Sequence, residues 1–396
     1  MQRRHALSLV ASLGSGLLLG PTRLWAAPPS GARLLVVFLR GAYDACNLLV
    51  PTGSNFYYET RREIAIARPS TDPASTLPLD DGWGLHPALR ETIYPLYQNG
   101  QATFIPFAGT HDLSRSHFET QDSIEQGRGP DSRGTYGSGF LNRLAGVISG
   151  VRPMAFTDQL PMVFQGEQRV PNTALRTLGR SSVDARQSQL IASMYQGTSL
   201  GAQVQEGFAV RDEVMRDMSA EMEASGRNAV SSKGFEAEAK RIARLMADGY
   251  NLGFVDIGGW DTHINQGGAQ GYLANRLEEL GAGLAAYAQE MGPAWRDTTV
   301  VVISEFGRTF RQNGSRGTDH GHGTVYWVLG GGVRGHRIAG VQQRLERETL
   351  FQDRDLPVLN EYRAIFGGLA QRLYGLSASQ LDTVFPGAAP RDLGLV

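Results

Sequence analysis

Residues 33–44 read RLLVVFLRGAYD, a continuous apolar run that ends at a glycine and an aspartate. Strands that are buried on both faces of a parallel sheet have unbroken apolar runs instead of alternating ones. The stretch therefore predicts a central strand that stops at Asp44. Strand-like runs recur along the chain in ATFIPFAG (102–109), LGFVDIGG (252–259), TTVVVIS (298–304) and TVYWVLGGG (324–332).

Helical patterns separate these runs. Ser116, followed three residues later by Glu119, has the capping pattern that starts a helix. Alternating strands and helices favour an α/β fold with a mainly parallel sheet and helices on both faces. The other helices are expected at 86–100, 137–150, about 268–291 and 358–376.

The domain organisation follows from length and from one polar region. A chain of 396 residues exceeds the size at which one core usually stops growing, so one large domain with an insertion, or two domains, is expected. The polar stretch at about 181–249 is predicted to be a helical insertion. Its second half has apolar residues at helical spacing, namely Phe235, Ala239, Ile242 and Leu245. We predict a single domain over residues 28–396.

Residues 1–27 have the pattern of a cleavable export signal. Arg3 and Arg4 precede an apolar run at 7–20, as in twin-arginine signals, and small residues follow. The alternative is an N-terminal membrane anchor, but the run is shorter than the roughly 20 residues that a membrane span needs. After cleavage, no stable membrane span is expected. We predict a periplasmic or secreted protein, exported by the twin-arginine or Sec route.

Charge and cysteine content exclude some classes. The formal net charge is −1, and loss of the three arginines within residues 1–26 makes it −1 − 3 = −4. A mildly acidic protein gives no electrostatic reason to expect nucleic acid. Cys46 is the only cysteine, so no internal disulfide can form.

Candidate metal ligands collect just after predicted strands. In a parallel sheet, ligands bind beyond the carboxyl ends of the strands. Carboxylates with imidazoles suit zinc, manganese or iron, in one-metal or two-metal sites. Asp44 could instead only terminate a strand, and Glu305 could pair with Arg308. The candidates are Asp44, Asp261, His263, Glu305, Asp319, His320 and His322.

Four stretches carry a resemblance to a known family. They are FLRGAYDACNLLVP (38–51), RSHFETQD (115–122), GWDTHINQ (259–266) and the long segment from SEFGRTFRQ to GGGVRG (304–335). In this order behind an export signal, they resemble the bacterial family called domain of unknown function 1501. That family is sulfatase-like and belongs by fold with the alkaline phosphatase superfamily. The resemblance implies an alkaline-phosphatase-like α/β fold and a metal site, but no substrate.

The resemblance also implies roles for particular residues. Asp44, Asp319 and His320 would bind one divalent metal, with Asp261 and His263 at a second position and His322 as a further ligand. One or two ions of zinc, manganese, iron or calcium are expected. Cys46 lacks the Cys-x-Pro-x-Arg context that sulfatases convert to formylglycine.

Residues 115–117 are the expected catalytic segment. Ser116 is the candidate nucleophile because it opens a predicted helix, whose N-terminus stabilises anions. The same serine could be an ordinary helix cap with Glu119. His117 could be a ligand, a substrate contact or a packed histidine. Arg115 could pair with an anionic substrate or remain solvated.

Three functions compete. The first is an exported metal-dependent hydrolase or transferase acting on an anionic phosphate or sulfate ester. The second is a non-catalytic exported binding or assembly protein, for which the resemblance suggests a companion of the family called domain of unknown function 1800. The third is an oxidoreductase, because Gly330, Gly332 and Gly335 match G-x-G-x-x-G after a strand.

Overall fold

A central mixed sheet organises the chain. The computed structural model describes residues 31–129, 137–175, 185–198, 200–207 and 234–396. The sheet has the strand order β10-β5-β9-β8-β1-β7-β6, and β11 pairs with β5. Its strands are β1 (Arg33–Leu39), β5 (Ala102–Gly109), β6 (Pro153–Ala155), β7 (Leu252–Ile257), β8 (Thr298–Ser304), β9 (Thr324–Leu329), β10 (Arg337–Ile338) and β11 (Asn360–Glu361).

The sheet is mainly parallel, as the sequence predicts. β1 lies between β7 and β8 and is parallel to both, whereas β9 is antiparallel to its neighbours β5 and β8. The strands β5, β7 and β8 therefore point the same way. A small antiparallel sheet lies apart from this one and contains β2 (Leu49–Val50), β3 (Leu77–Pro78) and β4 (Gly84–Leu85).

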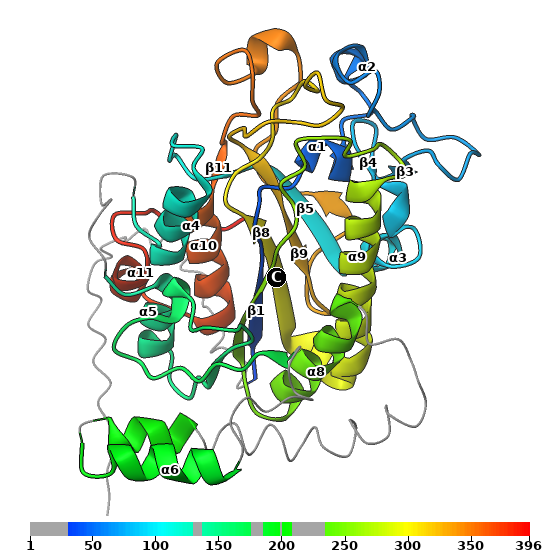
Figure 1. Cartoon of the computed structure of the whole chain (residues 1–396). Helices are drawn as coiled ribbons and strands as arrows, with labels where there is room; N and C mark the ends of the chain where they lie inside the picture. Colours follow the sequence, from blue (N-terminus) through cyan, green and yellow to red (C-terminus); the bar gives the residue numbers. More distant parts are fainter. Residues whose placement is uncertain (1–30, 130–136, 176–184, 199, 208–233) are drawn as a thin grey trace, which may run out of the picture.

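Helices cover both faces of the sheet, which confirms the predicted layers. One face carries α4 (His117–Gln126), α5 (Phe140–Val147), α10 (Tyr362–Tyr374) and α11 (Ala378–Val384) (Figure 1). The other carries α1 (Ala45–Leu48), α3 (Ile93–Gln98), α8 (Phe235–Asp248) and α9 (Tyr272–Met291). Further helices among the described residues include α2 (Asn55–Thr60), α6 (Ala185–Tyr195) and the 3-10 helices η1 (Pro87–Leu89), η3 (Met162–Phe164), η5 (Gly292–Asp297) and η6 (Arg347–Thr349).

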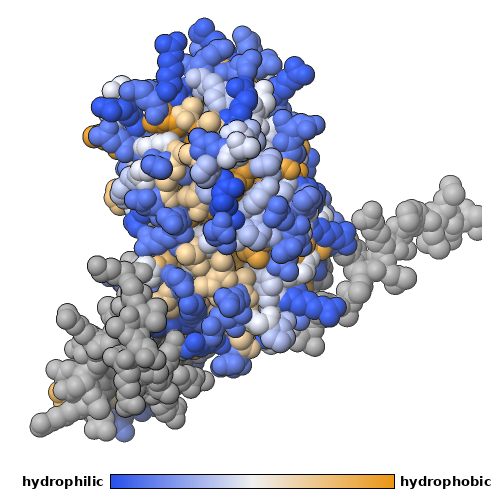
Figure 2. All heavy atoms as spheres, turned by 90° about the vertical axis from the view of Figure 1, so that its right-hand side faces the viewer, coloured by the Kyte–Doolittle hydropathy of each residue, from blue (hydrophilic) through white to orange (hydrophobic). Residues whose placement is uncertain are grey.

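Side chains of β1 explain why its sequence is apolar throughout. Leu35, Val37 and Leu39 belong to the hydrophobic core on the α8 and α9 side. The alternate residues, among them Val36 and Phe38, belong to the core on the α5 and α10 side. Both faces of the strand are therefore buried. The outer face of the molecule in Figure 2 is mainly hydrophilic, with smaller hydrophobic areas between.

Proline and glycine account for two differences from the predicted helices. The helix expected at 86–100 is divided into η1 and α3. Proline has no N–H and is tolerated only in a first turn, so Pro95 requires α3 to begin close before it, at Ile93. α9 begins at Tyr272, after Gly271 with φ 119°. Asp44 does not end a strand but caps α1, where its side chain accepts from the Cys46 N–H.

The structure removes the observation that supported the oxidoreductase alternative. The glycines from Gly330 to Gly335 connect β9 to β10 instead of opening a helix. A dinucleotide-binding fingerprint needs a helix N-terminus at this point to receive the pyrophosphate. The G-x-G-x-x-G match is therefore coincidental.

Two sequence predictions concern regions that are only partly described. Residues 1–27, the expected export signal, lie outside the described residues. The expected insertion at 181–249 is described in three pieces, and its last piece forms the predicted helix, α8. Within the described part of the chain, we find no helix with the length and apolar character of a membrane span.

Candidate metal centre

Loops after three parallel strands meet at one edge of the sheet. Asp261 and His263 follow β7, and His320 lies in the connection from β8 to β9. His117 is the first residue of α4, which follows β5. Because β5, β7 and β8 point the same way, their carboxyl ends bring these four side chains together.

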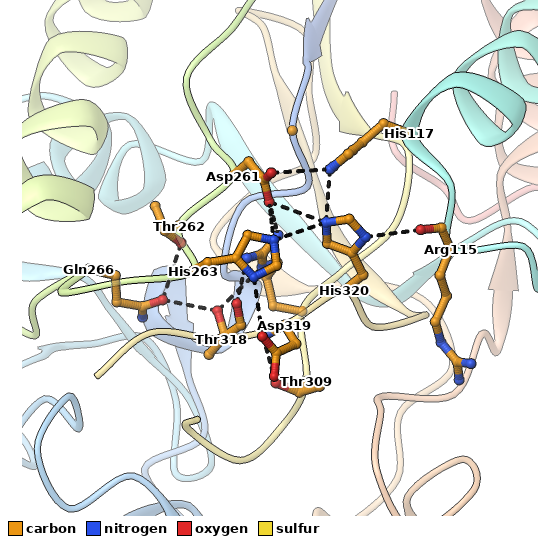
Figure 3. A network of polar contacts seen from close by, with 12 residues as sticks. Arg115, His117, Asp261, Thr262, His263, Gln266, Thr309, Thr318, Asp319 and His320 are labelled. Carbon is orange, nitrogen blue, oxygen red and sulfur yellow. Dashed lines mark hydrogen bonds and ion pairs between the residues drawn. The ribbon is translucent and has the colours of Figure 1, made fainter. Parts of the chain in front are cut away.

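The imidazole Nε2 atoms and one carboxylate converge (Figure 3). His320 Nε2 lies 3.0 Å from His117 Nε2 and 3.1 Å from His263 Nε2. Asp261 Oδ1 lies 2.9 Å from His263 Nε2 and 3.3 Å from His320 Nε2, and its Oδ2 lies 3.5 Å from His117 Nε2. Neighbouring ligands at about 2.0–2.1 Å from one metal ion are separated by roughly 2.9–3.4 Å. The separations among His117, Asp261 and His320 therefore fit ligands around a single ion, and His263 Nε2 adjoins two members of this group.

The second nitrogen of each ring is held from outside the centre. His117 Nδ1 lies 2.7 Å from Glu305 Oε1, and His320 Nδ1 lies 3.0 Å from the carbonyl oxygen of Arg115. His263 Nδ1 lies 3.1 Å from Asp319 Oδ1. These oxygens accept hydrogen bonds, so each Nδ1 donates and a neutral ring turns the Nε2 lone pair inward. Metal-ligating histidines in proteins are oriented in this way.

Charged groups border the centre, and the Arg308 guanidinium lies against one oxygen of Asp261. Burial lowers the pKa of His320, which favours its neutral form. Partial burial opposes ionisation of Asp261, but the hydrogen bond and charge of Arg308, together with the charges of the neighbouring histidines, outweigh it and lower the pKa of this carboxyl. The hydrogen bond to Glu305 raises the pKa of His117. A proton on His117 can supply the positive charge, and a metal ion would replace it.

The donor set indicates which metals fit. Three imidazoles and one carboxylate suit zinc or iron, whereas calcium takes oxygen ligands. Of the expected metals, calcium therefore does not fit this set. Among the described residues, His117, Asp261 and His320 form one group whose ligand atoms all lie within 4.8 Å of one another. The Asp261 side chain is 43% exposed and that of His320 is 28% exposed, so the centre is open to solvent.

Asp44, expected to be a metal ligand, lies elsewhere. Arg61 binds both of its oxygens, with Nη1–Oδ2 at 2.5 Å and Nη2–Oδ1 at 3.1 Å. Gln266 Nε2 donates to Oδ2 at 2.6 Å. Both members of the Asp44–Arg61 ion pair are buried. The guanidinium takes the place that a cation would have beside this carboxylate.

Two further predicted ligands also lie outside the four-residue cluster. Asp319 accepts from the Asn313 amide and orients the His263 ring, so it supports a ligand instead of being one. His322 is buried against the Phe351 ring, and burial lowers its pKa to about 4. Of the three candidate ligands in residues 318–324 (TDHGHGT), only His320 therefore reaches the cluster, and Asp319 and His322 do not.

Of the expected catalytic segment 115–117, only His117 directs its side chain into the cluster. His117 points into the centre, whereas the Arg115 guanidinium turns away and pairs with buried Asp355 at 2.6 Å (Figure 3). Only the backbone carbonyl of Arg115 touches the cluster. Ser116 is the N-cap residue of α4, but its side chain makes no capping hydrogen bond. The alternative of a capping box with Glu119 is therefore not formed.

A comparison with protein families identifies the chain. The family described as "Protein of unknown function (DUF1501)" matches residues 31–385. The chain belongs to this family. No curated protein matches it.

Solved structures that resemble this DUF1501 chain include phosphatases and sulfatases. A protein in the alkaline phosphatase superfamily from Vibrio parahaemolyticus has a TM-score of 0.37 and 11% identity, and the match covers 82% of this chain and 67% of that one. The 2-O GAG sulfatase BT1596 has a TM-score of 0.35 and 9% identity, and the match covers 91% of this chain and 76% of that one. A TAB5 alkaline phosphatase mutant with Mg bound in the M3 site has 0.34 and 11%, with 91% and 99% covered.

Two residues of this DUF1501 chain have roles that the sequence does not reveal. Glu305 is fully buried and orients His117, and it does not pair with Arg308. Arg308 instead donates to Asp261 Oδ1 at 2.5 Å. Both residues follow the buried strand β8, which marks them as near the site. Their partners come from other loops, which no local pattern specifies.

Proposed function

We propose that the protein is an exported metal-dependent hydrolase or transferase acting on phosphate or sulfate esters. The site would hold one divalent ion through His117, Asp261, His263 and His320. The observation that carries the proposal is the convergence of three imidazole Nε2 atoms on one carboxylate, with every Nδ1 bound from outside. Inward-facing imidazole nitrogens beside a carboxylate are the donors that a divalent ion binds, and Arg308 contacts this carboxylate at Oδ1.

The position of α4 supports an anionic ester as the substrate. His117 is both a proposed ligand and the first residue of this ten-residue helix. The first N–H groups of a helix have no partner within it and, with the helix dipole, attract phosphate or sulfate groups. A substrate oxyanion beside the ligands would therefore also face the N-terminus of α4.

The chain's own residues would orient the reacting groups. A bound divalent ion would polarise an ester oxygen and lower the pKa of a nucleophilic water or hydroxyl. Ser116 is our candidate nucleophile, because its hydroxyl is not committed to capping α4 and its neighbour His117 faces the centre. Arg308 holds Asp261 in its ionised form. Glu305 and Asp319 keep the rings of His117 and His263 in place.

Export and a partner complete the proposal. The sequence of residues 1–27 supports export to the periplasm or outside the cell. A companion protein of the family called domain of unknown function 1800 would be the partner.

The test combines metal analysis with a substrate screen. Protein purified without chelator is analysed for bound metals, and then screened with phosphate monoesters, phosphate diesters and sulfate esters. We expect about one divalent ion per chain in the wild type, and loss of both metal and activity in His320→Ala. Ser116→Ala should keep the metal and lose activity. A folded wild type that binds no divalent metal would refute the proposal, and metal binding without esterase activity would favour a non-catalytic binding role.

A further inference from the structure

A buried chain of hydrogen bonds connects the metal centre to the Asp44–Arg61 ion pair. Arg308 donates from Nη1 to Asp261, from Nε to Thr318 Oγ1 at 3.3 Å and from Nη2 to the Thr318 carbonyl. Thr318 Oγ1 lies 3.0 Å from Gln266 Oε1, and Gln266 Nε2 donates to Asp44. Figure 3 shows Gln266 to the left of the cluster, with dashed lines to Thr262 and Thr318.

The direction of every hydrogen bond in this chain is fixed by its charged ends. Ionised Asp44 can only accept, so the amide of Gln266 must face it with Nε2 and turn Oε1 toward Thr318. The Thr318 hydroxyl therefore donates to Gln266 and offers a lone pair to its other neighbour. That neighbour is Arg308, which can only donate.

Because Arg308 is buried, these hydrogen bonds determine where its side chain lies. Its side chain has no solvent exposure, and Thr318 and Gln266 are also fully buried. A buried guanidinium N–H that loses its partner is costly, so Arg308 stays where these acceptors hold it. Its Nη1 then lies against Asp261 Oδ1, the oxygen that is also 2.9 Å from His263 Nε2 and 3.3 Å from His320 Nε2, while Oδ2 lies 3.5 Å from His117 Nε2.

We propose that Thr318 and Gln266 are positioning residues of the metal centre. They hold Arg308 against one oxygen of Asp261 and thereby fix the orientation in which this carboxylate faces the three imidazoles. The inference rests on the proposed metal site and adds two residues that touch neither the ligand nitrogens nor the substrate. The GWDTHINQ motif would then supply a positioning residue as well as two ligands, because Gln266 is its last residue.

The test measures metal affinity. Zn²⁺ dissociation constants are obtained by competition with a chromophoric chelator for the wild type, Thr318→Val and Thr318→Ser. Loss of an outer-shell partner typically weakens metal binding about 10–100-fold, so we expect this loss in Thr318→Val. Thr318→Ser keeps the hydroxyl and should bind within about threefold of the wild type, which a merely structural role of the methyl group would not predict. Thr92→Val, at a buried hydroxyl without a hydrogen-bond partner, is the matched control.

A second variant keeps the inference testable if Thr318→Val folds poorly. Gln266→Met leaves Asp44 paired with Arg61 and should weaken Zn²⁺ binding by itself. In the double variant, the two losses should not multiply, because both substitutions break one chain. Wild-type affinity in folded Thr318→Val or in Gln266→Met, or a double variant with multiplied losses, would overturn the inference. A wild type that binds no Zn²⁺ would instead overturn the metal centre itself.

Discussion

Glu305→Gln tests whether the negative charge of Glu305, and not only its size and hydrogen bonds, supports His117 as a metal ligand. Glu305 Oε1 accepts from the Gly41 N–H at 2.8 Å, the Gln121 amide at 2.9 Å and His117 Nδ1 at 2.7 Å. Its Oε2 accepts from the Ser304 hydroxyl at 2.9 Å. The glutamine oxygen can keep the first three bonds. The substitution therefore removes the negative charge behind His117 with little change in packing.

The other end of the new amide is also accommodated. Ser304 Oγ lies 2.6 Å from the Leu39 carbonyl, so its proton can go there while its lone pair accepts from the glutamine NH₂. Glu305→Gln should therefore fold like the wild type. Without the carboxylate, His117 becomes a weaker base and a weaker metal ligand. We expect divalent metal to bind about 10–100-fold less tightly, or about 1.4–2.8 kcal/mol.

Competition titration with a chelator measures this loss, and thermal unfolding of the metal-free proteins verifies the fold. Glu125→Gln is the matched control, since Glu125, which lies on α4, is likewise a buried acid and is bound to Arg40 and the Val163 N–H. It should leave metal affinity unchanged. Equal affinity of Glu305→Gln and the wild type would refute the role given to Glu305.

Three further predictions concern stability. Burial lowers the pKa of His86 to about 4, so the folded state binds fewer protons than the unfolded state between pH 6.5 and 4. The contribution of neutral, buried His86 to the unfolding free energy should be fully present above pH 6.5 and be lost, by up to about 3 kcal/mol, as the pH falls toward 4. In urea unfolding, the free energy of His86→Asn should therefore depend less steeply on pH. Arg61→Ala leaves Asp44 buried without its partner and should cost about 3–5 kcal/mol in urea unfolding, whereas Arg347→Ala, at an exposed ion pair, should change little. Zn²⁺ at 100 times its dissociation constant should raise the unfolding free energy by about 2.7 kcal/mol in the wild type, but not with chelator or in His320→Ala.

Much of the fold is legible in the sequence because its strands are buried on both faces. The run at 33–39 is apolar at every position after Arg33, and both cores use it. The strand at 102–109 matches its prediction residue for residue. The antiparallel direction of β9 was not predicted, because direction depends on the connection and not on the strand's own side chains.

The site was predictable in part. The predictions included Asp261 and His263 because they follow a strand, His320 because it lies one loop after another strand, and His117 because it adjoins Ser116 at a predicted helix start. They gave Asp44 a ligand role, since nothing in RGAYD announces the guanidinium of Arg61, which reaches it in three dimensions. They placed Asp319 among the ligands, although it contacts His263 and not the centre. Which carboxylate binds and which orients depends on distances that sequence spacing does not set.

The most direct test of the account is to locate the metal. Crystals of the protein grown with Zn²⁺ are measured at the zinc absorption edge, and an anomalous difference map is calculated. We predict one strong peak at about 2.0–2.1 Å from Nε2 of His117, His263 and His320, beside the Asp261 carboxylate. A zinc-free centre, or a peak at Asp44 or His322 instead, would contradict it.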